Sequence, residues 1–306
     1  MTEEKLLPIG FYDLIGAEAL SHQKITHELL MDFVSHDFQL IKPSLVEFGT
    51  KNDNEAFQAH DLESGESLII RHDITLQIKR MLQGKLKNMP LPLKICYSGD
   101  VLNIKDNQLL YKNVDRQMTQ VGLEVIGKDD DESLLQIVIK LLESLKNFLN
   151  VEDMVLEFSI ANFFKKIAED LNLKITEELL NAINSKNISF IAESNHANGK
   201  IIEALLLSKD ITEVCNLINN LPIEVAKKNR ILALEGVIKK ITKIFGKSLQ
   251  INVDIFNHQS NYHQDINLNI LSKKSPIILA RGGKYQLCKK IRAVGATVYI
   301  NKLINL

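Results

Sequence analysis

The chain has 306 residues, of which 45% are hydrophobic and 25% charged, a composition typical of folded globular proteins that excludes disordered, collagen-like and rod-like classes. Its 37 basic and 38 acidic residues give a net charge of −1, so it carries no global positive field for a nucleic acid. No stretch reaches the roughly 18 continuous apolar residues that span a bilayer, and no export signal is evident, so we expect a cytoplasmic protein. The cysteines Cys96, Cys215 and Cys288 lie too far apart to indicate a disulfide framework or a metal site, and we expect buried thiols.

The first third of the chain mixes helical and strand patterns. Apolar residues at helical spacing predict a helix within residues 17–38, followed by a strand that ends at Pro43. Four further strands and one helix are predicted at residues 68–71, 94–97, 101–104 and 119–126, and at 75–82. The last two strands flank the polar residues 105–113, which predicts an antiparallel pair joined by a long loop.

The rest of the chain is first helical and then mixed. Four acidic residues at 129–132 precede an apolar face and predict a strong helix between residues 128 and 150, and a strand is predicted at 152–158. Helices are then predicted at 176–182, 199–207, 211–219 and 224–244, and strands at 249–256, 266–271, 277–280 and 296–300. We therefore predict an α+β core interrupted by a helical insertion, with domains at residues 1–160, 161–246 and 247–306.

The common nucleotide-binding and hydrolase motifs are absent from the sequence. It contains no P-loop, no Gly-x-Gly-x-x-Gly after a strand, no Gly-x-Ser-x-Gly and no His-Glu-x-x-His. His258 and His263 are accompanied by Asp254 and Asp265, but ligands at that spacing on a strand or loop do not converge, so we predict no metal site. The pair Gly282-Gly283 allows either a turn or the close approach of a ligand to the backbone.

Several short segments, taken in order, resemble one family. They are residues 7–13 (Leu-Pro-Ile-Gly-Phe-Tyr-Asp), Pro43 with Glu47, 71–75 (Arg-His-Asp-Ile-Thr), 96–103 with 116–127, 280–285 (Ala-Arg-Gly-Gly-Lys-Tyr), and Val294-Gly295. In this order they are similar to the histidyl-tRNA synthetase-like proteins, and Gln-x-Gly-x-Glu-x-x-Gly within 120–127 is the most specific match. The resemblance covers about residues 6–158 and 249–306. It implies an α+β class II aminoacyl-tRNA synthetase-like core, a mostly antiparallel sheet flanked by helices, with a helical insertion and usually a dimer.

Two departures from the family pattern argue against amino-acid activation. The motif 2 arginine of the family falls on Asn103, and the motif 3 arginine falls on Lys302, preceded by Asn301 where the family has an acid. Activation brings a carboxylate against a phosphate and needs positive charge at the α-phosphate. Because lysine lacks the planar fork of arginine and asparagine is uncharged, we expect no enzymatic activity.

Residues 261–264 (Asn-Tyr-His-Gln) resemble a segment of a catalytically silent branch, the regulatory subunits of ATP phosphoribosyltransferase. That branch lacks the anticodon-binding domain, and we expect none here because the chain ends at Leu306. The resemblance implies a non-catalytic subunit that activates the short-form catalytic subunit and contributes to feedback inhibition by L-histidine in the first step of histidine biosynthesis. It also implies a homodimer within a hetero-oligomer, with no cofactor, no tRNA and no membrane partner.

The resemblance also predicts where a histidine-like ligand binds. Asp73, Gln120 and Glu124 match positions that hold the ammonium and imidazole groups of histidine, which need carboxylate or amide acceptors. The alternative is that Gln120 and Glu124 are ordinary polar residues of a half-exposed strand. The remaining candidates are Tyr262 and His263 for the ligand, with Tyr262 alternatively in the core; Arg116 and Arg281 for an anion, with Arg116 alternatively solvated; and Gly282 and Gly283 for close backbone approach. Gln264 and Gln286 depart from the family pattern and leave the ligand open.

Two other functions are compatible with the same residues. One is a truncated class II synthetase-like enzyme that still activates an amino acid, which ATP/pyrophosphate exchange would detect. The other is a stand-alone histidine-binding module, which would bind histidine and leave the phosphoribosyltransferase rate unchanged.

Overall fold

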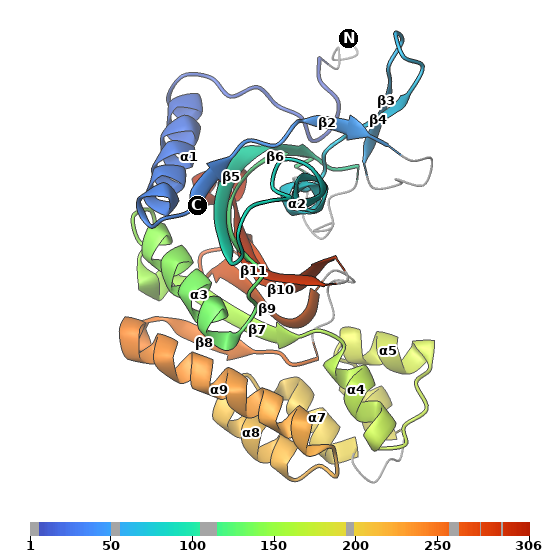
Figure 1. Ribbon diagram of the computed structural model, residues 1–306. Helices are drawn as coiled ribbons and strands as arrows, with labels where there is room; N and C mark the ends of the chain where they lie inside the picture. Colours follow the sequence, from blue (N-terminus) through green and yellow to red (C-terminus); the bar gives the residue numbers. More distant parts are fainter. Residues whose placement is uncertain are drawn as a thin grey trace, which may run out of the picture. The chain divides into compact units, whose positions relative to one another are not determined.

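The computed structural model describes residues 6–49, 56–104, 115–193, 199–256, 263–275, 277–288 and 290–306 (Figure 1). The chain divides into two compact units. The first consists of Met1–Glu124 and Thr297–Leu306, and the second of Val125–Ala296. No helix among the described residues is long and apolar enough to cross a membrane.

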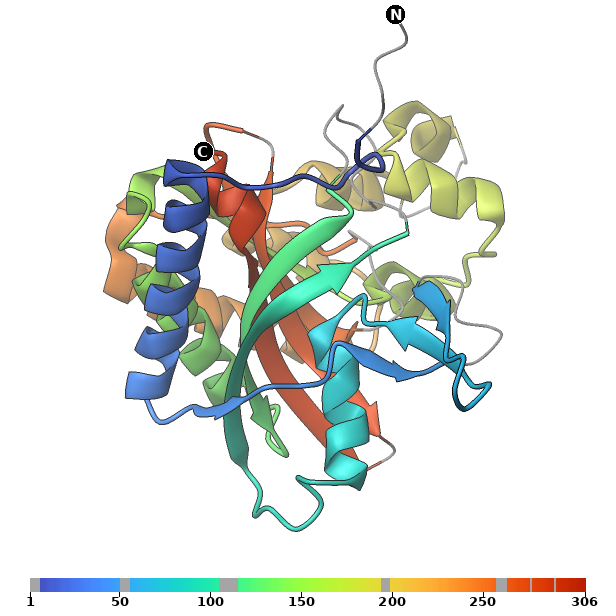
Figure 2. The same ribbon diagram turned by 90° about the horizontal axis from the view of Figure 1, so that it is seen from above.

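Among its described residues, the first unit contains three helices and the strands of two sheets. Its elements are α1 (Ala17–Ser35), β1 (Gln39–Ile41), β2 (Val46–Phe48), β3 (Phe57–His60), β4 (Ser67–Ile70), α2 (Ile74–Gln83), β5 (Leu93–Leu102), most of β6 (Gln117–Ile126) and α10 (Ile300–Ile304). Strands β2, β4 and β3 form a small antiparallel sheet, while β1 pairs in parallel with β5 (Figure 2). Helix α1 contacts β5 and α10 and buries Leu29 and Phe33.

The described part of the second unit contains seven helices, four complete strands and most of β11. Its elements are α3 (Asp131–Leu145), β7 (Met154–Ile160), α4 (Phe163–Asp170), α5 (Glu177–Asn184), α6 (Ile188–Glu193), α7 (Gly199–Leu207), α8 (Ile211–Asn219), α9 (Val225–Phe245), β8 (Gln250–Val253), β9 (His263–Ser272), β10 (Ile278–Cys288) and β11 (Ile291–Tyr299), with 3-10 turns at Val151–Asp153 and Gly246–Ser248. Helices α7, α8 and α9 lie side by side beyond β7 and β8 (Figure 1).

The large sheet has the strand order β1-β5-β6-β11-β10-β9-β7-β8, and β6 and β11 each begin in one unit and end in the other. It is mixed: β1 and β8 pair in parallel at its ends, and β9 pairs antiparallel with both β7 and β10. Alternate residues of β7 and β9 are buried, among them Phe158 opposite Leu268 and Leu156 opposite Ile270. This alternation places one apolar face of the sheet in the core.

The predicted α+β class with a sheet flanked by helices is confirmed, and α7 and α8 have the predicted bounds. Three expectations change. The strands expected at 94–97 and 101–104 are one strand, β5; β2 and β3 were not predicted; and Cys288 is partly exposed near the end of β10, whereas Cys96 and Cys215 are buried. The polar residues 105–113 lie outside the described residues, and the three predicted domain boundaries stay a prediction.

Helix α3 begins with a side-chain cap that has a titratable acceptor. Asp130 Oδ1 accepts hydrogen bonds from Ser133 N at 2.8 Å and from Ser133 Oγ at 2.7 Å. These bonds, together with the nearby Lys128, lower the pKa of Asp130 to about 2. Because its folded-state pKa is below the ordinary value, the stabilisation is present above about pH 4 and is lost as the pH falls towards 2.

We expect Asp130→Ala to lower the free energy of unfolding at pH 7 by about 1 kcal/mol, the usual cost of losing an N-cap. The difference from the parent chain should shrink between pH 4 and pH 2, as measured by urea unfolding at each pH. Asp130→Asn is the matched control, since asparagine caps as well as aspartate but does not titrate. A pH-independent difference for Asp130→Ala would contradict this assignment.

Candidate ligand-binding site

The Gln-x-Gly-x-Glu pattern lies on β6 and places three residues on one face of the strand. Gln120, Gly122 and Glu124 alternate along the strand, so they face the same side. A Cβ atom at Gly122 would overlap the Tyr97 ring, with Cε2 at 2.6 Å. Only glycine therefore leaves room for the Tyr97 ring to lie across β6 towards Glu124.

Glu124 is held by two hydroxyl groups inside the first unit. Its side chain is buried, with the residue 1% exposed, and Oε1 accepts hydrogen bonds from Tyr97 OH and Thr75 Oγ1, each at 3.2 Å. Tyr97 OH is also 2.9 Å from Thr297 Oγ1 and 3.0 Å from Thr75 Oγ1. Burial and the nearby Glu124 carboxylate raise the pKa of Tyr97 well above its ordinary value. The phenol is therefore protonated at neutral pH and can donate to Glu124.

Asp73 and Gln120 organise the start of α2. Asp73 is the N-cap of this helix, with its carboxylate accepting from Leu76 N at 3.3 Å and from Gln120 Nε2 at 3.4 Å. Gln120, 2% exposed, accepts from Ile74 N at 3.2 Å through Oε1. Burial raises the pKa of Asp73, and the Gln120 amide opposes that rise. Asp73 itself remains partly exposed, so it is the accessible member of this group.

Arg71, two residues before Asp73, is held by main-chain carbonyl groups. Its Nε donates to Asp100 O at 2.6 Å and its NH1 to Pro43 O at 3.0 Å. The guanidinium covers Gly99, where any side chain would overlap it. Burial lowers the pKa of Arg71, with Asp100 opposing. The side chain thus connects the chain around Pro43 to β5.

The motif 3 position in α10 is occupied by residues that bond within the first unit. Lys302 Nζ forms an ion pair with Asp115 Oδ2 at 2.6 Å, and both side chains are mostly buried. Asn301 Oδ1 accepts from Thr119 N at 2.7 Å, and its Nδ2 donates to Tyr12 OH. Burial, reinforced by Asp115, raises the pKa of Tyr12 to about 12. The charge of Lys302 is therefore neutralised by the protein itself.

Asn103 and Arg116 form two hydrogen bonds at the motif 2 position, one between their main chains and one from the Arg116 side chain. Asn103 N donates to Arg116 O at 2.8 Å, and Arg116 Nε donates to Asn103 O at 3.3 Å. The guanidinium carbon of Arg116 lies 4.7 Å from the ring centre of Phe57 and 5.4 Å from that of Phe11. The guanidinium of Arg116 is thus packed against two aromatic rings. Its predicted contact with an anion stays a prediction.

The other predicted residues belong to the second unit. Arg281, Gly282 and Gly283 lie inside the continuous strand β10 and not in a turn. A Cβ at Gly282 would overlap Gly295 O and lie 2.7 Å from Ala296 Cβ, so here β11 supplies the close backbone approach. Gly283 has a φ of 145° beside a register irregularity, and Arg281 Nε is buried without a hydrogen-bond partner among the described residues.

Some predicted residues cannot be placed together. Tyr262 and the possible metal ligand His258 lie outside the described residues, and His263 is described only as a strand position opposite Tyr285. Within the described residues, no three histidine, cysteine, aspartate or glutamate side chains gather as metal ligands. The structure therefore brings together Asp73, Gln120 and Glu124, and leaves the rest of the predicted ligand site untested.

Three members of the hydrogen-bonded group were not predicted as site residues. Thr75 and Tyr97 stand within the quoted family segments, so their proximity to the matched acids was the available signal. Thr297 lies 200 residues after its partner Tyr97, and no local pattern in the sequence indicates that contact.

Comparison with known families gives a match over nearly the whole chain. The family model described as "Histidyl-tRNA synthetase" matches residues 10–303. A curated relative from Paramagnetospirillum magneticum, named "ATP phosphoribosyltransferase regulatory subunit", is 26% identical over 318 aligned positions, which cover 98% of this chain and 81% of that relative.

Solved structures share the fold. A protein from Bacillus halodurans C, described as an ATP phosphoribosyltransferase regulatory subunit/histidyl-tRNA synthetase, has a TM-score of 0.79 at 18% identity and covers 100% of this chain and 83% of its own. A chain of the ATP phosphoribosyl transferase (HisG:HisZ) complex from Thermotoga maritima has a TM-score of 0.69 at 16% identity, covering 91% of this chain and 97% of its own. At these identities the likeness shows the fold alone.

We expect Gly122→Ala to destabilise the chain by about 1–3 kcal/mol, the usual cost of overpacking, because the added methyl group displaces the Tyr97 ring. Gly236→Ala is the matched control: this glycine lies in α9 with open space around its Cβ, so alanine should stabilise the chain by roughly 0.5–1 kcal/mol. Urea unfolding of both variants measures the two effects. Equal stabilities would refute the packing role of Gly122.

Proposed function

Because the chain belongs to the histidyl-tRNA synthetase family, we propose that it is a non-catalytic regulatory subunit of a short-form ATP phosphoribosyltransferase. In this role it activates the catalytic subunit and contributes to feedback inhibition by L-histidine, in the first step of histidine biosynthesis. The proposal rests on a contrast. The candidate amino-acid ligands Asp73 and Glu124 are present and held by hydrogen bonds, whereas the motif 3 cation is bound in an ion pair with Asp115.

The acidic group suits an amino-acid ligand. Asp73 offers a partly exposed carboxylate whose position is fixed by Gln120 and by the first turn of α2. Glu124 offers a second carboxylate whose orientation is fixed by Tyr97 and Thr75. Ammonium and imidazolium groups carry only donors, so two oriented carboxylates are the acceptors that they require. We assign Asp73 and Glu124 to the ligand, with Gln120 as a positioning residue.

The chain lacks comparable residues for contacting the α-phosphate during amino-acid activation at its motif 2 and motif 3 positions. Attack on an α-phosphate requires cations that are oriented before the reaction, and removing one such contact typically costs about 10²- to 10³-fold in rate. Asn103 brings no charge, and the Lys302 ammonium is held 2.6 Å from Asp115. Both facts favour a chain that binds an amino acid without activating it.

The names of the relatives support the proposed partner. Several curated relatives carry the name of the regulatory subunit, and one structural neighbour comes from a HisG:HisZ complex. We propose a homodimer of this chain within a cytoplasmic hetero-oligomer with the catalytic subunit. Inhibition then requires that histidine prefer one arrangement of the assembly, by an expected 1–3 kcal/mol or about 5- to 150-fold in affinity.

The proposal is tested by the ATP phosphoribosyltransferase activity of a purified short-form catalytic subunit, with and without this chain, over a histidine titration. We expect the rate to rise when the chain is added and histidine to reverse the rise. An unchanged rate with separate elution of the two proteins would favour a stand-alone histidine-binding module. Histidine-dependent ATP/pyrophosphate exchange by the chain alone would favour the synthetase-like enzyme instead.

Glu124→Gln tests the ligand site within that assay. The substitution keeps the shape of the side chain but removes its charge, so we expect the histidine concentration for half-inhibition to rise at least about tenfold, the worth of one charged hydrogen bond. Co-elution with the catalytic subunit should be retained. Glu143→Gln, at an exposed position of α3, is the matched control and should change neither property. Loss of co-elution with unchanged histidine sensitivity would show that Glu124 serves assembly.

A further inference from the structure

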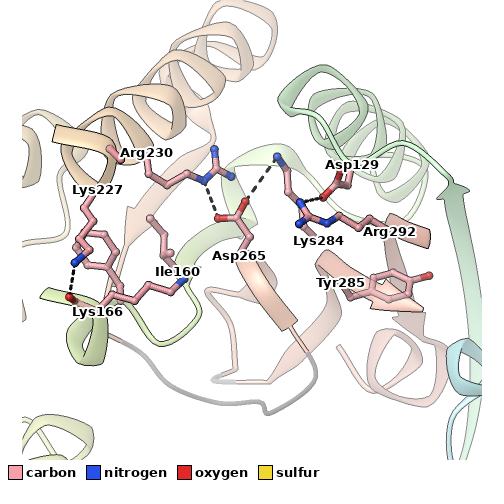
Figure 3. Close-up of a pocket in the computed structure, with 11 residues that line it drawn as sticks. Asp129, Ile160, Lys166, Lys227, Arg230, Asp265, Lys284, Tyr285 and Arg292 are labelled. Carbon is pink, nitrogen blue, oxygen red and sulfur yellow. Dashed lines mark hydrogen bonds and ion pairs between the residues drawn. The ribbon is translucent and has the colours of Figure 1, made fainter. Parts of the chain in front are cut away.

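The second unit contains a cavity of about 300 Å³ whose described lining residues come from seven elements or their flanks (Figure 3). It is lined by Asp129, Ile160, Phe163, Lys166, Ala226, Lys227, Arg230, Asp265, Lys284, Tyr285 and Arg292. Five of these side chains are cationic and two are acidic. These described lining residues include none of Asp73, Gln120 and Glu124, while Tyr262 and the side chain of His263 are not described.

A network of balanced charge forms the inner wall of the cavity. Arg230 Nε donates to Asp265 Oδ1 at 2.7 Å and Arg230 NH1 to Asp131 Oδ1 at 3.0 Å. The ammonium of Lys284, whose side chain is 6% exposed, lies 2.5 Å from Asp131 and 4.0 Å from Asp265. These two cations and two carboxylates neutralise one another, and Figure 3 shows Arg230 and Lys284 on either side of one of the carboxylates, Asp265. They leave little charge for a ligand.

The cations available to a ligand are on the outer walls. Lys166 projects from α4, is exposed, and forms no ion pair with any described residue. Arg292 enters from β11 with its side chain 69% exposed, and its guanidinium is loosely paired with Asp129 at 3.6 Å. Lys227 differs from these two, because its ammonium is bound 2.7 Å from Asp170 and 2.8 Å from Lys166 O. Lys166 therefore supplies the excess positive charge, and Arg292 is a second accessible cation, which lies 3.6 Å from Asp129.

Two helices also begin at this cavity. Phe163 and Lys166 are in the first turn of α4, and Ala226 and Lys227 are in the first turn of α9. Neither N-cap residue, Asn162 or Glu224, makes a side-chain cap hydrogen bond. The first N–H groups of a helix carry partial positive charge, so both helix ends add to the field of Lys166 and Arg292.

The remaining lining residues are apolar or aromatic and restrict the size of the ligand. Ile160 and Tyr285 lie beside the cations in Figure 3, and Phe163 also lines the cavity. Small-molecule sites typically enclose roughly 300–1,000 Å³, so this cavity is at the lower limit of that range. It suits a compact molecule with one anionic end and a small carbon frame.

We propose that this cavity is a binding site for a small phosphate-bearing molecule, with its phosphoryl oxygens contacted by Lys166 and Arg292. Phosphate offers several strong acceptor oxygens, so it can accept from an ammonium, a guanidinium and helix N–H groups at the same time. The site is additional to the proposed amino-acid site. It does not depend on the regulatory role, since it is defined by binding to this chain alone.

The test is isothermal titration calorimetry of the purified full chain with inorganic phosphate, pyrophosphate and succinate, each at low and at high salt. We expect one site per chain that binds pyrophosphate or phosphate more tightly than succinate, with weaker binding at high salt. Lys166→Gln combined with Arg292→Gln should weaken binding at least about tenfold, since each removes one charged contact. The thermal midpoint of this variant without ligand should be unchanged, because both side chains are exposed.

The matched control combines Lys165→Gln and Lys290→Gln, which remove charges one residue before Lys166 and two residues before Arg292 that are not among the described lining residues of the cavity. This control should bind as the parent chain does. Equal weakening in the control would reduce the effect to net charge and overturn the site. Absence of phosphate and pyrophosphate binding, or unchanged affinity in the Lys166 and Arg292 variant, would also overturn it. Tighter binding of succinate would overturn the assignment to phosphate.

Discussion

The phenol of Tyr97 is the group on which the first unit depends. A buried carboxylate is costly unless hydrogen bonds replace its lost water, and Tyr97 supplies one of them to Glu124. The same hydroxyl contacts Thr75 at the start of α2 and Thr297 near the end of β11, so three distant chain segments meet at one oxygen. This arrangement exists because Gly122 has no side chain. A sequence pattern that indicates a ligand site is therefore also a condition for packing this core.

Local periodicity was sufficient to predict much of this fold. Helices α7 and α8 bury one face each, and that spacing is visible in the sequence without any tertiary information. Strands β2 and β3 could not be predicted, since they have three and four residues that are half-buried or exposed and lack an apolar alternation. For the site, the family pattern supplied Gln120 and Glu124, but the contacts of Thr297 and of Arg230 depend on chain folding over about a hundred residues or more.

Several buried or half-buried cations of this chain are bound by partners within it. Arg71 is bound by the carbonyl groups of Asp100 and Pro43, and Lys302 is paired with Asp115. Arg230 and Lys284 share two aspartates. At the cavity of the second unit, Lys166 and Arg292 differ from these cations, since Lys166 forms no ion pair with any described residue and Arg292 lies 3.6 Å from Asp129. Electrostatic function in such a protein is better sought in unpaired or loosely paired charges than in the total.

Gly282 shows that a residue of a family signature can be required for packing and not only for activity. Its hydrogen atom faces Gly295 and Ala296 on β11, and a larger residue there would force apart the two strands. The close approach of β10 and β11 is enough to require glycine at this position, whatever the activity of the chain. The signature in β10 therefore reports that the sheet is intact, and a chain can carry it through any change of activity. Loss of a catalytic cation leaves no such trace in the packing, which is why fold and activity can diverge within one family.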